Sequence, residues 1–177
     1  PAAAVTFLEG PRPRILAHRG LATEAPENTL AAFRAAVAVG ATHVESDVRV
    51  SADGVAMLVH DATLERVSQD ATRVDATSAH ALQSLDLGGG HGIPTLAEAL
   101  AALPDTRWNL DLKVPAAVEP AVRAILEADA VGRVLVTSFD DATRARVVAA
   151  LPGVATSASR GLMARALVAV RLRRRTA

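Results

Sequence analysis

Two segments of this chain place polar side chains at every second position between mostly apolar neighbours. One is the stretch Val44–Val50, which carries Glu45 and Asp47, and the other is Trp108–Lys113, which carries Asp111. Successive side chains of a β-strand point to opposite faces of a sheet, so each segment sends its charges one way and its aliphatic side chains the other. Protein stability alone gives little reason for charges that face inward from several strands. Such charges indicate an active site at the end of the sheet.

Strands and helices are expected to alternate along the chain, and this order implies βα units with a mainly parallel sheet. The helices expected at 29–39, 95–103 and 116–129 carry apolar residues at helical spacing or a capping residue at their start. The expected strands are 14–17, 44–50, 55–59, 108–113, 134–138 and 154–157. The expected helices are 29–39, 95–103, 116–129, 141–151 and 161–173, with one short helix after Ser78.

The segment Ser51–Gly54 predicts a tight turn between two of these strands, because Asp-Gly tolerates the positive φ angles of a hairpin. A two-residue turn would place His60 opposite Asp47, and a four-residue loop would place it opposite Glu45. Both registers leave the imidazole on the face of the carboxylates. His18 ends the first strand and is expected to reach the same rim.

The length of 177 residues suits one domain, and we expect a single domain over residues 1–177. Polar side chains at positions i and i+2 of one strand favour a closed TIM-type α/β barrel over a flat sheet, because catalytic groups lie at the carboxyl ends of barrel strands. A closed eight-stranded barrel usually takes about 250 residues, so this chain is short for one.

Composition excludes several classes of protein. Lys plus Arg and Asp plus Glu each number 19, so no net charge recruits nucleic acid, and we expect no nucleic-acid partner. The chain has no cysteine, which excludes thiolate nucleophiles and zinc–thiolate sites. No apolar run approaches the roughly 18 residues of a transmembrane segment. The cytoplasm is the expected compartment, although the chain begins with Pro1 and a preceding segment could have been removed.

Three carboxylates are the candidate metal ligands. Glu45, Asp47 and Asp111 offer only oxygen atoms, and this donor set suits Mg²⁺ or Ca²⁺ rather than zinc. The alternative is that they are surface acids or members of salt bridges. The flanking valines make full exposure of Glu45 and Asp47 the weaker interpretation.

Histidines and cations complete the candidate site. His18 and His60 could act as general base and general acid at neutral pH, or each could be a structural histidine. Arg19 and Lys113 could neutralise a phosphate and its transition state, or they could pair with the nearby acids. Asn28 or Thr29 is expected to cap the helix that follows, and Asn28 is interpreted as a cap rather than a ligand.

Five short motifs follow one another along the chain, and none is specific alone. Their order resembles that of the glycerophosphodiester phosphodiesterase family, and the likeness runs over about 15–157. The motifs are His18-Arg19-Gly20, Pro26-Glu27-Asn28-Thr29, Glu45-x-Asp47, Asp53-Gly54 followed by His60-Asp61, and Asn109-x-Asp111-x-Lys113.

The resemblance implies a TIM-type barrel that hydrolyses a small-molecule glycerophosphodiester to glycerol 3-phosphate and an alcohol, with Mg²⁺ or Ca²⁺ as cofactor. It also implies that the glycerol hydroxyl of the substrate attacks phosphorus and that water then opens the cyclic phosphate. Matched residue by residue, the implied roles are acid–base catalysis for His18 and His60, metal ligation for Glu45, Asp47 and Asp111, and phosphate contact for Arg19 and Lys113.

The sequence departs from the family pattern in two ways. Asp111 stands where the family usually has Glu, and the family continues well beyond this length. We therefore expect a barrel that lacks its last strands, and a remnant that binds metal or phosphate without turnover is the alternative function. A Schiff-base enzyme using Lys113 is the weakest alternative, because the nearby acids would keep that amine charged. A homo-oligomer is also compatible with the sequence.

Overall fold

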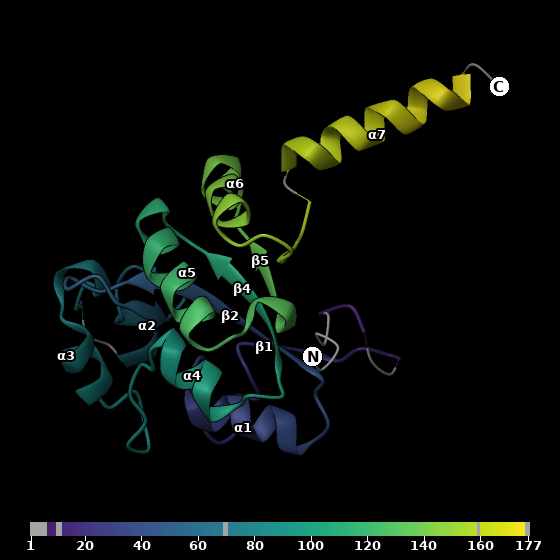
Figure 1. The fold of residues 1–177 in the computed structure, drawn as a ribbon. Helices are drawn as coiled ribbons and strands as arrows, with labels where there is room; N and C mark the ends of the chain where they lie inside the picture. Colours follow the sequence, from purple (N-terminus) through teal and green to yellow (C-terminus); the bar gives the residue numbers. More distant parts are fainter. Residues whose placement is uncertain (1–6, 10–11, 69–70, 159, 176–177) are drawn as a thin grey trace.

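The computed structural model describes residues 7–9, 12–68, 71–158 and 160–175. A six-stranded sheet forms the centre of the fold, with the order β1-β2-β4-β5-β6 and with β3 paired to β2 (Figure 1). Every pair along this path is parallel, whereas β3 runs antiparallel to β2. The strands are β1 (Leu16–His18), β2 (His43–Val50), β3 (Ala56–Leu58), β4 (Arg107–Leu112), β5 (Val134–Thr137) and β6 (Ala155–Thr156). The predicted α/β class with a parallel sheet is confirmed.

In the described part of the chain, seven α-helices connect and follow these strands. They are α1 (Leu30–Ala38), α2 (Glu65–Ser68), α3 (Ala79–Ser84), α4 (Leu96–Ala102), α5 (Val118–Glu127), α6 (Asp141–Ala150) and α7 (Arg160–Arg175). The predicted capping box is present, since Thr95 accepts from the backbone N–H of Glu98 and the Glu98 side chain accepts from Thr95 in return. The predicted helix 116–129 divides into a 3₁₀ turn, Pro115–Ala117, and α5. Among the described residues, no helix has both the length and the apolar character that crossing a membrane requires.

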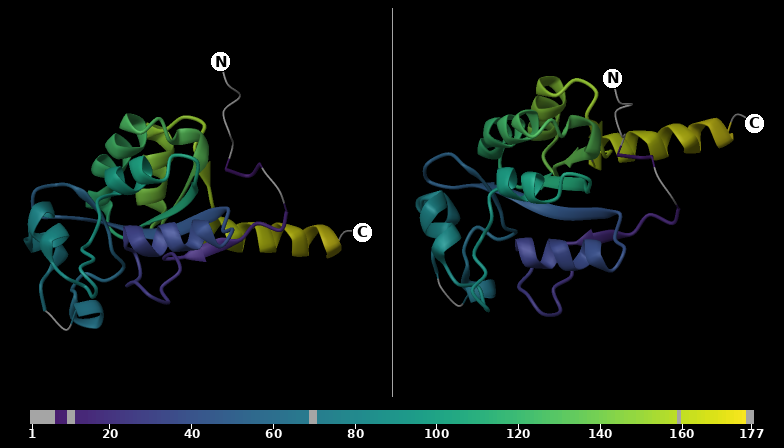
Figure 2. Two further views of the ribbon diagram at one scale, coloured as in Figure 1. Left: turned by 90° about the horizontal axis from the view of Figure 1, so that it is seen from below. Right: turned by 60° about the horizontal axis from the view of Figure 1, so that its bottom comes forward.

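One face of the sheet packs against helices and forms the main hydrophobic core. Val44, Val48 and Leu110 are fully buried there together with Trp108. The Trp108 ring lies edge-on to Phe33 of α1, with the ring centroids 5.0 Å apart. Helices α4, α5 and α6 lie along one side of the sheet, while α7 extends away from it (Figures 1 and 2). This face therefore takes the aliphatic side chains of β2 and β4 and leaves the opposite face to their charged residues.

The register of the β2–β3 hairpin differs from both predicted registers. Val48 lies opposite Leu58, and the backbone N–H of Ser51 donates to the Val55 carbonyl over 3.0 Å, so the loop has three residues. The Ser51 hydroxyl stabilises this loop by donating to Asp53 over 2.6 Å, and Gly54 adopts a φ of 78°. Both predicted registers were wrong by one residue. His60 lies beyond the end of β3, so strand pairing does not decide which way its ring points.

The packing of this core predicts the outcome of two leucine truncations. Leu110→Ala would leave a cavity beside Trp108, and we expect a loss of about 3 kcal/mol in the free energy of unfolding. Leu126 lies on α5 with 54% of its surface exposed, so Leu126→Ala should cost under about 1 kcal/mol. Urea unfolding of both variants measures the difference, and equal losses would contradict the assignment of the core.

Candidate functional site

The polar face of the sheet gathers oxygen-bearing side chains from two adjacent strands. Asp47 on β2 lies directly opposite Asp111 on β4, and Glu45 lies opposite Asn109. The three acids are 8% exposed or less. Alternation along two parallel strands in register places all four side chains on one face. The structure thus brings Asp47 and Asp111 side by side, with Glu45 two residues before Asp47.

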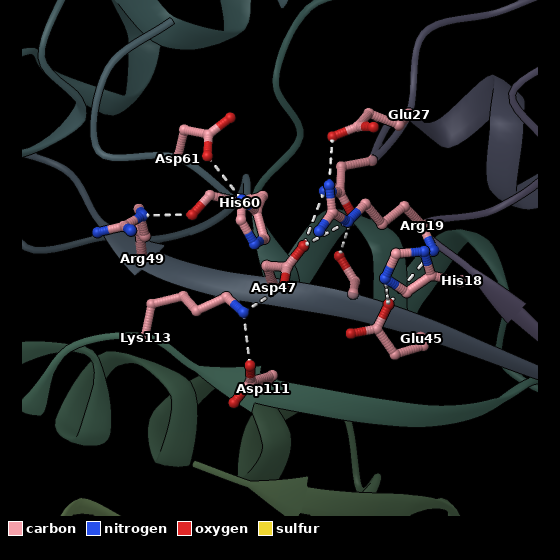
Figure 3. A network of polar contacts seen from close by, with 12 residues as sticks. His18, Arg19, Glu27, Glu45, Asp47, Arg49, His60, Asp61, Asp111 and Lys113 are labelled. Carbon is pink, nitrogen blue, oxygen red and sulfur yellow. Dashed lines mark hydrogen bonds and ion pairs between the residues drawn. The ribbon is translucent and has the colours of Figure 1, made fainter. Parts of the chain in front are cut away.

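Asp47 is the centre of a network of ion pairs (Figure 3). The Lys113 ammonium lies between the two aspartates, 2.7 Å from Asp47 Oδ1 and 2.5 Å from Asp111 Oδ2. Arg19 Nε lies 3.2 Å from Asp47 Oδ2, and Asn28 Nδ2 donates to the same oxygen over 3.2 Å. Positive charge from two separate segments therefore compensates the most buried carboxylate of the site.

Backbone geometry after β1 brings Arg19 to this point. Arg19 adopts a φ of 59°, and its N–H donates to the Glu45 carbonyl over 3.0 Å. Gly20 has a φ of 84°, and a Cβ built there would stand 2.7 Å from the backbone of Ala32. Only glycine fits so close to α1 in that conformation. The His-Arg-Gly motif is therefore the turn that directs the Arg19 side chain toward Asp47.

The two predicted catalytic histidines lie on either side of the acids. His18 is at the end of β1, and its Nε2 lies 3.8 Å from Glu45 Oε2. The ring of His60 points toward Asp47, and its Nδ1 lies 2.6 Å from Asp61 Oδ1 (Figure 3). The side chain of His18 is 70% exposed and that of His60 is 34% exposed. Both rings are thus open to solvent at the rim, where a small substrate could reach them.

Electrostatics distinguish the acids from the lysine. Burial and the neighbouring Asp47 carboxylate raise the pKa of Glu45 to about 7. Burial opposes the charge of Lys113, but hydrogen bonds to Asp111 and Asp47 outweigh it and hold the pKa of that ammonium above its ordinary value. Neighbouring carboxylates therefore act on both groups, on Glu45 in addition to its burial and on Lys113 against its burial.

The chemistry of this donor set fits a hard divalent cation. Asp111 Oδ1 and Asn109 Oδ1 are buried and accept no hydrogen bond from the described residues. Within the same part of the chain, no three potential metal-ligating side chains are gathered around one point, and Lys113 lies between the two aspartates. A divalent metal ion bound to both aspartates would therefore need to displace the Lys113 ammonium from between them. Glu45, Asp47 and Asp111 remain the predicted ligands, and Asn109 adds a fourth oxygen beside them.

Sequence reasoning missed several residues of the site. Of the two residues expected to cap α1, Thr29 is the cap, because its side chain accepts from the Ala32 N–H. Asn28 is 3% exposed and donates to Asp47, so its interpretation as a cap was wrong. Its place in the Pro-Glu-Asn-Thr motif was the available signal. Arg66, which pairs with Asp61, had no such signal in the sequence.

The raised pKa of Glu45 predicts a pH-dependent stability in the presence of chelator. Its pKa is about 7 in the folded chain against an ordinary value of 4.5. Its contribution to the free energy of unfolding is therefore full below pH 4.5 and is lost as the pH rises through about 7. Urea unfolding across this range should show the advantage of the wild type over Glu45→Gln shrinking as the pH rises. Parallel profiles for the two proteins would contradict the shift.

Comparison with known proteins places this arrangement in a family. Residues 18–159 match the model of the glycerophosphoryl diester phosphodiesterase family. Over 150 residues the chain is 39% identical to the Mycobacterium tuberculosis protein named probable glycerophosphodiester phosphodiesterase 2, covering 84% of this chain and 57% of that protein.

Two solved structures share the fold. One is the glycerophosphoryl diester phosphodiesterase domain of another M. tuberculosis protein, with a TM-score of 0.77, 30% identity, and coverage of 86% of this chain and 62% of that one. The other is an Oleispira antarctica phosphodiesterase in complex with the product sn-glycerol-3-phosphate, with a TM-score of 0.74, 30% identity, and coverage of 81% and 64%.

The chain spans less than two thirds of the length of these relatives. The structural neighbours confirm the predicted TIM-type architecture, of which the described sheet supplies five parallel strands where a closed barrel has about eight. The match of the family model over most of the sequence establishes the identity of this segment. The chain belongs to the glycerophosphoryl diester phosphodiesterase family.

Proposed function

We propose that this chain carries the active site of a metal-dependent enzyme that hydrolyses glycerophosphodiesters to glycerol 3-phosphate and an alcohol. The observation that carries the proposal is the polar face itself, where buried acids, two cations and two solvent-accessible imidazoles come together. The related Oleispira antarctica phosphodiesterase was solved with sn-glycerol-3-phosphate, and this supports the same product class here.

The two imidazoles supply a base and an acid. Asp61 is an acceptor for His60 Nδ1–H, which leaves the lone pair of the neutral ring on Nε2. His60 is therefore assigned as the base and would take the proton from the attacking glycerol hydroxyl as its oxygen bonds to phosphorus. His18 would give a proton to the departing alkoxide as its bond to phosphorus breaks. Water then opens the cyclic phosphate, with the two proton transfers reversed.

Positive charge on the polar face would bind the phosphate. Glu45, Asp47 and Asp111 are the residues that would hold Mg²⁺ or Ca²⁺, and the ion would supply charge neutralisation for the phosphoryl oxygens. Arg19 and Lys113 would contact the same oxygens through their N–H donors. With the ion bound, the phosphate would face three positive groups, namely the ion, Arg19 and Lys113. Without the ion, the carboxylates outnumber the positive side chains at this point.

A second candidate function is binding of metal or phosphate without turnover. The observation that favours it is the open sheet, with β1 and β6 at its two edges. A Schiff-base reaction at Lys113 has less support, because that reaction requires a neutral amine and the pKa of Lys113 is raised. Release of glycerol 3-phosphate from glycerophosphocholine by monodisperse protein separates the enzyme from the binding protein.

Truncation of either histidine should strongly reduce hydrolysis. We expect His18→Ala and His60→Ala each to lower kcat by a factor on the order of 10² to 10⁴, because each removes one proton-transfer group. His80 lies exposed on α3 and is not a member of the described ion-pair network around Asp47 (Figure 3), so His80→Ala is the matched control and should keep wild-type turnover. Full activity in either of the first two variants would remove the acid–base assignment.

Removal of divalent ions should silence the enzyme. We expect turnover to fall to background in EDTA and to return when Mg²⁺ or Ca²⁺ is added in excess, since the ion neutralises phosphate charge. The same glycerol 3-phosphate assay measures this. Asp75 lies exposed in an ion pair with Arg73, so Asp75→Asn should respond to metal as the wild type does. Undiminished turnover in chelator would refute the metal role.

A further inference from the structure

A continuous chain of ion pairs links the two sides of the site. It begins at Asp47, which pairs with Arg19, and continues from Arg19 Nη1 to Glu27 Oε1 over 3.0 Å. Arg66 Nη2 lies 2.6 Å from the same Glu27 oxygen, and Arg66 Nε lies 2.6 Å from Asp61 Oδ2. Asp61 then meets His60 through its other oxygen. The loop after β1 and the loop after β3 are thereby joined through one guanidinium.

Arg66 lies on a short helix that follows a buried residue. The short helix α2 follows Leu64, which is fully buried in a second hydrophobic cluster with Met57, Leu82 and Ile93. The Ser68 hydroxyl donates to the Leu64 carbonyl over 3.1 Å and closes the turn. The start of α2 is therefore anchored through Leu64, although the Arg66 side chain is 48% exposed. From this position Arg66 reaches two carboxylates at once.

Both carboxylates that Arg66 contacts are held in the ionised form. Burial opposes ionisation of Glu27, but hydrogen bonds from Arg66 and Arg19 outweigh it and keep the pKa of that carboxyl low. Burial likewise opposes ionisation of Asp61, and hydrogen bonds from His60 and Arg66 keep its pKa low. An ionised Asp61 can only accept, so His60 must donate through Nδ1.

We propose that Arg66 is a positioning residue, which clamps Glu27 and Asp61 with adjacent N–H donors and so fixes the His60 ring with Nε2 directed at the site. The proposal rests on the proposed function for its catalytic meaning, but the ring orientation is a property of the protein alone. The other groups around His60 are Arg49, whose Nε donates to the His60 carbonyl over 2.7 Å, and Asp47, toward which the ring points. Neither of them contacts Nδ1.

The test compares Arg66→Met with Arg73→Met. Arg73 is also an exposed arginine, but in the described part of the chain it pairs with Asp75 and not with Asp61. Its truncation is therefore the matched control. Ring-nitrogen NMR shifts report which nitrogen of His60 carries the proton. We expect wild type and Arg73→Met to hold the proton on Nδ1, and Arg66→Met to show a mixture of tautomers. We also expect Arg66→Met to lower kcat by on the order of tenfold with little change in KM.

A conservative variant covers the case in which Arg66→Met fails to fold. Arg66→Lys keeps the charge but not the two parallel donors of the guanidinium, and it should give an intermediate mixture of tautomers and an intermediate kcat. Unchanged ring shifts in Arg66→Met, or equal changes in Arg73→Met, would overturn the proposal. If the wild type releases no glycerol 3-phosphate, the proposed function fails, while the NMR shifts still decide whether Arg66 positions the ring.

Discussion

The compensation of buried carboxylate charge on the inner face of β2 is the constraint on which the rest of the site depends. Val44 and Val48 anchor β2 in the core, and strand alternation then forces Glu45 and Asp47 onto the opposite face. Buried charges are costly unless they are paired. Lys113 and Arg19 supply that pairing, and each is delivered by a different strand end. The two faces of β2 therefore contribute to the core and to the polar site respectively.

Much of the fold could be predicted because its signals are local. The alternation in β2 and β4, the cap at Thr95 and the order of strands and helices all depend on neighbouring residues. The hairpin register could not be predicted, because the side chain of Ser51 adds a contact that selects a three-residue loop. Turn-type preferences take no account of such a side-chain hydrogen bond.

Short motifs predict which residues belong to the candidate site. They do not predict the hydrogen bonds and ion pairs that join those residues. The acids and histidines fall within short motifs, whereas Asn28 and Arg66 act across sequence separations of 19 and 39 residues, on Asp47 and Glu27 respectively. Asn28 and Thr29 both resembled caps because they precede α1, and only the assembled structure shows that Thr29 caps the helix while Asn28 contacts Asp47. Long-range ion pairs carry no periodicity, so they emerge only when the strands are assembled.

Direct location of the ion tests the central claim that acids from β2 and β4 hold one divalent cation between two imidazoles. A crystal soaked with Mn²⁺ would show this ion by its anomalous scattering. The account predicts one strong peak in contact with Glu45, Asp47 and Asp111, with Lys113 displaced from between the two aspartates. A peak elsewhere, or an undisturbed Lys113 bridge with no peak at the acids, would contradict it.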